Sequence, residues 1–306
     1  TLAEAVLGFV GPVTINGTRF DAKNIAAELE YQVEKGYYEK GIPGPQRKAI
    51  VSPLIHTIVD RILHRPLREL RPIIGIATTA MRERHLMAYA SDPRLMSAIG
   101  RVGAAGTILP RATSHDAVLV VDANLGALKT DPVVQRSIRY IITPDGNGFR
   151  GVVALRYKNT GTFTWKTTRY RTYTRVYLPP GTQLLRSRGA MVKDKSDAPG
   201  RVDVSAELGR AVFGAFVSIE PGQERTLTFE FVLAPDIADR IRNGSYALEV
   251  QKQLGSVATP LTLDLEFGTL VKSAEPPEAP AAWGDARYHH ETNLREDRMF
   301  TVQLPH

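Results

Sequence analysis

Acidic and amide side chains are concentrated at the centre of the chain, where an apolar run, AVLVV, gives way to the polar segment DANLG. The residues that bracket this turn are Asp116, Asp122, Asn124 and Asp131. Oxygen side chains at this density could bind Ca²⁺, although their spacing differs from that of an EF-hand loop. Asp and Asn in turns more commonly accept hydrogen bonds from nearby backbone groups. We therefore expect turn chemistry and no metal, with an ion held by Asp122, Asn124 and Asp131 as the alternative.

A second candidate site alternates basic and aromatic residues along one predicted strand, residues 168–178. Its members are Arg169, Arg171, Tyr173, Arg175 and Tyr177. Successive side chains of a strand point to opposite faces, so these five share one face. The face could bind acidic or neutral glycan through charge and ring stacking, or pack against another subunit. The competing interpretation is a solvated face on which arginine stems cover the tyrosine rings.

Motifs of the common enzyme classes do not occur in the sequence. There is no GxSxG nucleophile elbow, Walker loop or GxGxxG fingerprint. The chain has no cysteine, which excludes disulfides, thiolate catalysis and cysteine metal sites. The pair His289-His290 beside Glu291 has no third ligand at a suitable spacing, so we interpret it as structural. We expect no catalytic residues and no cofactor, and favour a non-enzymatic protein.

Composition indicates a globular protein with room for two domains. Of 306 residues, 43% are hydrophobic and 23% are charged, and the formal net charge is +7. Excess positive charge can attract anionic glycans, lipids or nucleic acid, but the charges mostly alternate in sign, which favours a role in solubility. We expect no nucleic-acid partner. No stretch of the sequence approaches the roughly 20 apolar residues of a membrane span.

The first residues, from Thr1 onward, enter at once into a predicted helix and strand, LAEAVLGFVGPV, without a signal peptide. We therefore expect a preceding segment, outside this sequence, that carries export or membrane-anchoring signals. Such a segment and the lack of cysteine fit an extracytoplasmic protein of the bacterial cell envelope or surface. Membrane anchoring is expected only through that segment.

Residues 1–110 are predicted to form an α/β domain. Apolar residues at helical spacing predict helices over 2–9, 22–38, 46–63 and about 66–82. The dipeptide Asn16-Gly17 predicts a hairpin between two short strands. The segment HLMAYA, residues 85–90, predicts a further strand, and Asp92 followed by Pro93 predicts the start of another helix.

Residues 111–268 are predicted to form an antiparallel β-sandwich. Their apolar period is close to two, and turn signals such as PDGNG, PPGT and EPGQ separate the strands. The predicted strands span 137–143, 151–158, 168–178, 211–219, 225–232, 245–251 and 261–267. The fold class that follows for the whole chain is α+β.

Residues 269–306 are predicted to form a Pro/Ala-rich linker and an extended C-terminal arm. The linker is SAEPPEAPAAWG, and DRMFTVQL, residues 297–304, alternates like one more strand. That strand could close its own sandwich or pair with the edge of a neighbouring chain. We expect the pairing within the chain, with exchange between chains as the alternative.

Six collinear segments of the chain are similar to a known family. The most distinctive are GFVGPVTING (8–17), HLMAYASDPRLMSAIGRVGAAG (85–106) and DAVLVVDANLGALKTDPVVQRSIRY (116–140), and the others lie within 174–185, 207–231 and 246–263. On these segments the chain resembles the bacterial family catalogued as domain of unknown function 4012, over residues 1–268. That family has no assigned activity. The resemblance implies an envelope protein with an N-terminal membrane anchor.

Residues 1–63 are similar in layout to the end of a LytR–CpsA–Psr domain, a family that transfers glycan polymers from a polyprenyl pyrophosphate carrier to the cell wall. The shared layout is a helix (LAEAVLGFV), a strand (GPVTI), a helix, a loop, and a helix that opens with PQRKAI. In that family arginines and an aspartate clamp the pyrophosphate and its metal. Here the phosphate-binding candidates are Lys40, Arg47 and Lys48, and the remaining catalytic positions would precede Thr1. This departure favours a scaffold that has lost its catalytic site.

Two functions follow as hypotheses. The first is a non-enzymatic envelope or surface protein with a structural, assembly or adhesion role. Its partner would be a second copy of itself or cell-wall glycan, and it would assemble by exchanging edge strands or the C-terminal arm. The alternative is a glycopolymer transferase acting on polyprenyl-pyrophosphate-linked glycans, with catalytic residues upstream of Thr1. An Arg-rich, Asp-bearing segment before Thr1 would favour the transferase.

Overall fold

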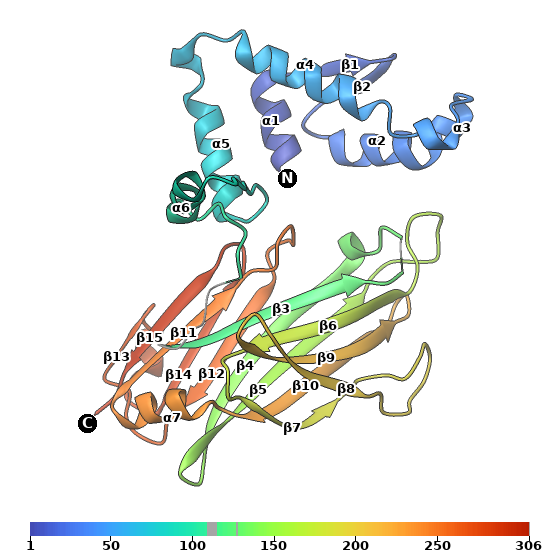
Figure 1. Ribbon diagram of the computed structural model, residues 1–306. Helices are drawn as coiled ribbons and strands as arrows, with labels where there is room; N and C mark the ends of the chain where they lie inside the picture. The colour runs from blue at the N-terminus through green and yellow to red at the C-terminus, as the bar shows by residue number, and fades with distance from the viewer. Residues whose placement is uncertain (109–114, 127, 306) are drawn as a thin grey trace. The chain divides into compact units, whose positions relative to one another are not determined.

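The chain folds into two compact units, each with its own core (Figure 1). The computed structural model describes residues 1–108, 115–126 and 128–305. The first unit is Thr1–Ala105 and the second is Gly106–His306. The domain boundary expected between residues 110 and 111 lies outside the described residues. The fold class is α+β, as predicted, because the helices are concentrated in the first unit and two large sheets form the second.

The first unit packs helices against a short β-hairpin. Its helices are α1 (Leu2–Val10), α2 (Ile25–Tyr31), α3 (Tyr37–Glu39), α4 (Val51–Leu63), α5 (Arg71–Arg82) and α6 (Pro93–Arg101), and its strands are β1 (Val13–Ile15) and β2 (Thr18–Phe20). A π-helical turn, Gln32–Gly36, joins α2 to α3. Apolar residues on one face of α1 and α4 pack on the hairpin, since helical spacing places them together. Leu7, Val13, Phe20 and Leu54 are buried in this core.

Local signals set the turns of the first unit. Asn16 and Gly17 both have positive φ, 48° and 76°, as a two-residue hairpin turn requires. The Asp92 carboxylate accepts hydrogen bonds from the backbone N–H groups of Arg94 and Leu95, at 2.8 and 2.9 Å, and caps α6. None of the described helices is long and apolar enough to cross a membrane.

The strand predicted over residues 85–90 was wrong, because this segment is irregular. A strand needs a partner whose backbone completes its ladder, and residues 85–90 have no pairing with β1 or β2. The N–H of Ala88 instead donates to the carbonyl of Ala104 at 2.9 Å, which ties the segment to the turn that follows α6. The apolar run alone therefore did not determine its structure.

The second unit is a sandwich of two sheets together with helix α7 (Pro235–Arg242). The six-stranded sheet has the order β14-β12-β4-β5-β10-β7, and the seven-stranded sheet has the order β13-β15-β11-β3-β6-β9-β8. The strands in chain order are β3 (Asp116–Asn124), β4 (Val134–Asp145), β5 (Gly148–Asn159), β6 (Tyr170–Leu178), β7 (Gln183–Arg188), β8 (Val202–Glu207), β9 (Arg210–Ile219), β10 (Glu224–Val232), β11 (Ser245–Gln251), β12 (Pro260–Glu266), β13 (Ser273–Glu275), β14 (Arg287–Asn293) and β15 (Arg298–Gln303).

Alternating apolar residues on the two inner faces form the main core. Val153, Leu155 and Tyr157 of β5 and Phe213, Ala215 and Val217 of β9 are among its fully buried members. β4 and β5 pair from Val134↔Asn159 to Asp145↔Gly148, so their hairpin closes at the DGNG turn that the sequence predicts. The period of two thus places every second residue of these strands in the core.

Residues 269–306 form β13, β14 and β15 where we expected a linker and an extended arm with one terminal strand. That terminal strand, β15, pairs within the chain as expected. β14 pairs with β12, and β15 pairs with β11 and β13, so the segment completes both sheets. Its apolar residues Tyr288, Phe300 and Val302 are fully buried, and their burial favours docking over an extended chain. The sheets are also not purely antiparallel, since β3 pairs with β11 and β4 pairs with β12 in parallel.

Candidate functional site

The predicted basic and aromatic stripe lies on the outer face of the seven-stranded sheet. Four of its members belong to β6, and Arg169 directly precedes that strand. Thr172, Thr174 and Val176 alternate with them and are fully buried on the opposite, inner face. The alternation of the sequence therefore predicted the shared face correctly.

Arg169 and Arg171 bind carboxylates contributed by two separate loops. Arg171 donates from Nε and Nη2 to Asp194 Oδ2 at 2.8 and 2.6 Å. Arg169 donates to Glu220 Oε1 at 2.6 Å and to Asp194 Oδ2 at 3.2 Å. The hydrogen bonds from Arg171 lower the pKa of Asp194 to about 2, so this carboxylate is ionised at neutral pH.

The other three members of the stripe bind carboxylates of β8. Arg175 Nη1 and Tyr177 Oη both donate to Glu207 Oε2, at 3.2 and 2.9 Å. Tyr173 Oη donates to Asp203 Oδ2 at 2.6 Å, and burial together with this bond raises the pKa of Tyr173 to about 12. The three arginines are thus balanced by acidic residues of the same chain. This balance weakens attraction to acidic glycan and favours a face held together by its own ion pairs.

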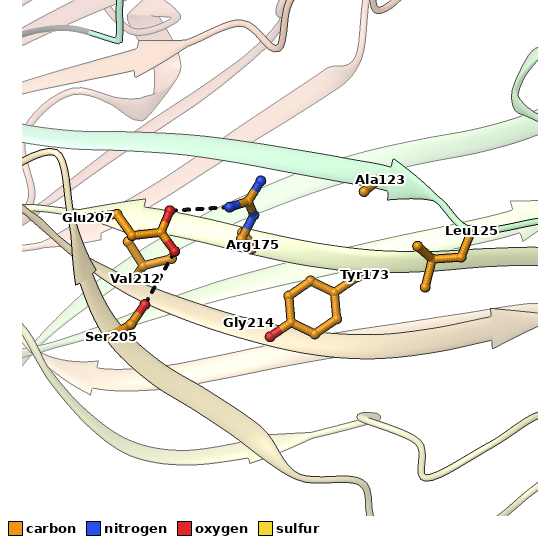
Figure 2. Close-up of a pocket in the computed structure, with 8 residues that line it drawn as sticks. All are labelled: Ala123, Leu125, Tyr173, Arg175, Ser205, Glu207, Val212 and Gly214. Atoms are coloured by element: carbon orange, nitrogen blue, oxygen red, sulfur yellow. Dashed lines mark hydrogen bonds and ion pairs between the residues drawn. The ribbon is translucent and has the colours of Figure 1, made fainter.

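A shallow groove of about 460 Å³ crosses the same face (Figure 2). Its lining residues are Ala123, Leu125, Tyr173, Arg175, Ser205, Glu207, Val212 and Gly214. The ring of Tyr173 lies against Gly214, where a Cβ atom would come within 2.4 Å of its hydroxyl oxygen. The groove therefore has an apolar floor with one ion pair, Arg175–Glu207, at its side. Such a surface can stack on a ring and donate or accept hydrogen bonds. Ser205 Oγ lies 3.5 Å from Glu207 Oε1 in the groove, and no histidine is among the lining residues.

The central oxygen side chains do not form one ligand set. Asn124 Nδ2 donates to Asp131 Oδ2 at 2.6 Å, and Asn124 Oδ1 accepts the N–H of Gly126 at 2.8 Å. These bonds are turn chemistry, as we expected. Asp122 instead points between the sheets, where it pairs with Arg136 and accepts hydrogen bonds from Tyr157 and Thr174. The alternative of an ion held by all three residues loses its geometric basis.

Asp116, which the sequence placed at the edge of the turn, is buried inside the sandwich. Its Oδ2 atom accepts hydrogen bonds from Tyr140 Oη at 2.5 Å and from Tyr246 Oη at 2.7 Å. Burial raises the pKa of Asp116, although the hydrogen bonds oppose this change. Sequence reasoning missed this cluster because its members come from β3, β4 and β11, which no local pattern connects.

The phosphate-binding candidates of the first unit point to partners of their own. Lys40 Nζ donates to Gln32 Oε1 at 2.7 Å and to Thr18 Oγ1 at 3.0 Å. Arg47 lies 3.5 Å from Glu34 Oε2. Lys48 is exposed in the segment that precedes α4. Lys40, Arg47 and Lys48 share no contact and no common partner among these interactions.

The histidine pair is also divided between two environments. His289 Nδ1 is hydrogen-bonded to Asp264 Oδ1 at 2.7 Å. The ring of His290 packs against Phe300 and Tyr288, with centroids 5.6 and 6.0 Å away, and burial lowers the pKa of His290. In the part of the chain that the structure describes, no group of three or more His, Asp or Glu residues could hold a metal ion.

Comparisons with known proteins include solved structures. No protein-family model and no curated protein sequence matches the chain. The chain is similar to a crystal structure from Legionella pneumophila, described as that of a "putative nutrient binding protein", with a TM-score of 0.36 and 8% sequence identity. The similarity covers 61% of this chain and 71% of the Legionella chain.

Proposed function

We propose that the chain is a non-enzymatic protein of the bacterial cell envelope or surface that assembles by exchanging its C-terminal strands between copies. One observation carries this proposal. The segment 269–306 supplies an edge strand to each sheet, β14 in the six-stranded sheet and β13 in the seven-stranded sheet. The same segment supplies β15, which lies between β13 and β11 (Figure 1).

Strand exchange would keep every contact of this segment while changing which copy provides it. β14 pairs with β12 over seven positions, Pro260↔Asn293 to Glu266↔Arg287. β15 pairs with β11 from Ser245↔Gln303 to Val250↔Arg298. A neighbouring copy of the segment offers an identical ladder, so exchange preserves the pairing at little structural cost. Head-to-tail exchange of this kind can extend into a polymer.

A non-enzymatic role is supported by how the buried polar groups are used. The carboxylates of Asp116 and Asp122 each accept hydrogen bonds from tyrosine or threonine side chains of other strands. Their bonds cross between strands and sheets, as expected for groups that stabilise a scaffold. The motifs that resemble an envelope family of unknown function support the extracytoplasmic setting.

Crosslinking tests the exchange, since the chain has no cysteine of its own. Thr262 of β12 lies directly opposite Glu291 of β14, and directly opposed antiparallel residues are close enough for a disulfide. We expect the Thr262→Cys/Glu291→Cys double variant, refolded and oxidised, to run as covalent multimers on non-reducing gels. Each single-cysteine variant is the control, because it can form disulfides only through random collisions between chains. A crosslinked monomer alone would overturn strand exchange.

The transferase alternative is supported by the order of elements in residues 1–63. Helix α1, the β1–β2 hairpin, helices α2 and α3, and helix α4 follow one another in the chain, and α4 begins at Val51, after the PQRKAI segment. The alternative predicts that the full-length protein binds a polyprenyl pyrophosphate and that Arg47→Ala weakens this binding. A full-length protein that neither binds nor cleaves such a lipid would reject it.

A further inference from the structure

Figure 1 shows the end of the sandwich where β5 leads into β6. Exposed apolar side chains gather there. In the connecting loop, residues 160–168, Phe163 is 63% exposed and Trp165 is 49% exposed. The N–H of Lys129, in the loop after β3, donates to the carbonyl of Lys166 at 3.0 Å, so the two loops lie side by side. Leu128 beside Lys129 is also exposed. The apolar tip consists of Leu128, Lys129, Phe163, Trp165 and Lys166.

Hydrogen bonds within the 160–168 loop hold the two aromatic residues in place. Thr164 N–H donates to the carbonyl of Thr167 at 2.9 Å, and Thr167 Oγ1 donates to the carbonyl of Thr162 at 2.7 Å. At the base of the loop, Thr160 N–H donates to the carbonyl of Val133 at 2.9 Å. The backbone is therefore ordered by its own polar groups. The rings of Phe163 and Trp165 are therefore exposed on a structured loop.

The tip is one part of a larger apolar end. β11 runs parallel to β3, so the loop that follows β11 lies at the same end of the sandwich. Two hydrogen bonds between the Gln253 amide and the backbone of Asp122 fix this loop beside the end of β3. It exposes Leu254 and Val257, the latter by 75%. Exposed apolar side chains grouped at one end of a domain can mark an interaction surface.

The chemistry of the tip fits the interface of a lipid bilayer. Tryptophan and phenylalanine favour the headgroup region, and neighbouring leucines reach the acyl boundary. Neither tip segment, LGALKT or TGTFTWKTT, contains an acidic residue, while each contains one lysine. Of the two lysines, Lys129 is exposed, and its charge is complementary to anionic lipid headgroups. A glycan site would set available hydrogen-bonding side chains beside the rings, whereas the hydroxyls of Thr164 and Thr167 bond within the loop and Leu128 adds an aliphatic side chain.

We propose that the apolar tip docks the sandwich on a membrane surface that contains anionic lipid, with Phe163 and Trp165 inserted at the interface. This docking is independent of the strand exchange proposed above, because the tip contains no residue of the segment 269–306. A monomer that binds vesicles would support the docking proposal and not the exchange.

Tryptophan fluorescence tests the insertion directly, since the chain contains two tryptophans, Trp165 and Trp283. In the Trp283→Phe variant, Trp165 is the one remaining emitter. We expect its emission to shift to the blue when phosphatidylcholine vesicles containing phosphatidylglycerol are added, and to be quenched when the lipids carry bromine on their acyl chains. Emission that stays unchanged with these vesicles would overturn the proposal.

Vesicle co-sedimentation then assigns the contact. Phe163→Ser/Trp165→Ser should lower partitioning at least about tenfold, because each ring contributes a transfer free energy sufficient for such a factor. Lys129→Gln should weaken the preference for phosphatidylglycerol, since Lys129 is exposed. Leu270→Ser is the matched control, since Leu270 is 59% exposed and follows β12 at the opposite end of the sandwich, and it should bind as the parent does. Equal binding by the double-serine variant, or binding to isolated cell-wall glycan in place of vesicles, would refute membrane docking.

Discussion

Asp122 of β3 and Arg136 of β4 form an ion pair that joins the two sheets of the sandwich. Their side chains are only 6% and 11% exposed. Arg136 also donates to Gln253 Oε1 at 3.1 Å and to Thr259 Oγ1 at 3.2 Å. The pair is therefore held by hydrogen bonds from several segments, as a buried pair must be to offset the loss of hydration.

Removing only one partner of this pair should be costly. We expect Arg136→Met to lower the free energy of unfolding by about 3 kcal/mol, because it leaves the Asp122 carboxylate buried without a cation. Adding Asp122→Asn should recover part of the loss, since no charge then remains buried. Urea denaturation of the single and double variants measures both effects. A double variant that is less stable than Arg136→Met would contradict this account.

Asp116 should make the stability of the sandwich fall as the pH rises from about 4 towards neutrality. Burial raises the pKa of Asp116 above its ordinary value of 3.8. As the pH rises, the unfolded chain therefore ionises first, which stabilises it relative to the folded chain. In Asp116→Asn this decline should disappear. Chemical denaturation at a series of pH values measures the slope.

The tyrosines of the same cluster provide a second check. Tyr246→Phe removes one donor from Asp116 Oδ2 and leaves the carboxyl group in place. The ionised carboxylate of Asp116 loses more stabilisation than the protonated carboxyl group when the Tyr246 hydroxyl is removed. We expect the variant to be destabilised more at neutral pH than at pH 4. An equal loss at both pH values would show that Asp116 does not ionise in the folded protein.

Asp194 should have the opposite pH dependence. Its pKa is lowered from 3.8 to about 2, chiefly by hydrogen bonds from Arg171. The stabilisation is fully present above the unfolded pKa and is lost as the pH falls towards 2. We expect Asp194→Asn to lose about 1–2 kcal/mol at neutral pH, allowing for partial exposure, and almost nothing at pH 2. The fully exposed Asp197 of the same loop is the control, and Asp197→Asn should match the parent at every pH.

Two glycines of β5 should respond differently to the same substitution. A Cβ atom at Gly151 would lie 2.2 Å from Phe231 and 2.9 Å from Leu233, both in the core. A Cβ atom at Gly148 would meet nothing closer than the carbonyl of Asp145 at 3.7 Å. We expect Gly151→Ala to lower the free energy of unfolding by about 1–3 kcal/mol and Gly148→Ala to change it little. Equal urea midpoints for the two variants would contradict the packing described.

Several elements could be predicted from local sequence because their causes are local. Asn16-Gly17 and the DGNG turn at residues 145–148 both close hairpins, since their residues tolerate the required backbone angles. The shared face of the Arg and Tyr stripe follows from the period of a strand alone. The segment 85–90 shows the limit, because an apolar run becomes a strand only where a partner ladder exists.

β7 and β8 were missed for a related physical reason. Both are edge strands with mostly exposed residues, so their sequences lack the alternation that burial on one face produces. β8 nevertheless supplies Asp203 and Glu207, the carboxylates that bind three members of the stripe. The charge balance of the stripe therefore depends on β8, a strand that the sequence pattern did not predict.

The sequence by itself determined the α+β class, most strands of the sandwich and which side chains share a face, because these follow from periodicity and turn chemistry over a few residues. Only the tertiary structure decided what those side chains do. It placed Asp122 against Arg136, balanced Arg171 with Asp194, and paired the C-terminal strands with β11 and β12. These contacts join segments distant along the chain or lying in different sheets, and their energies depend on burial that exists only when the sheets have packed.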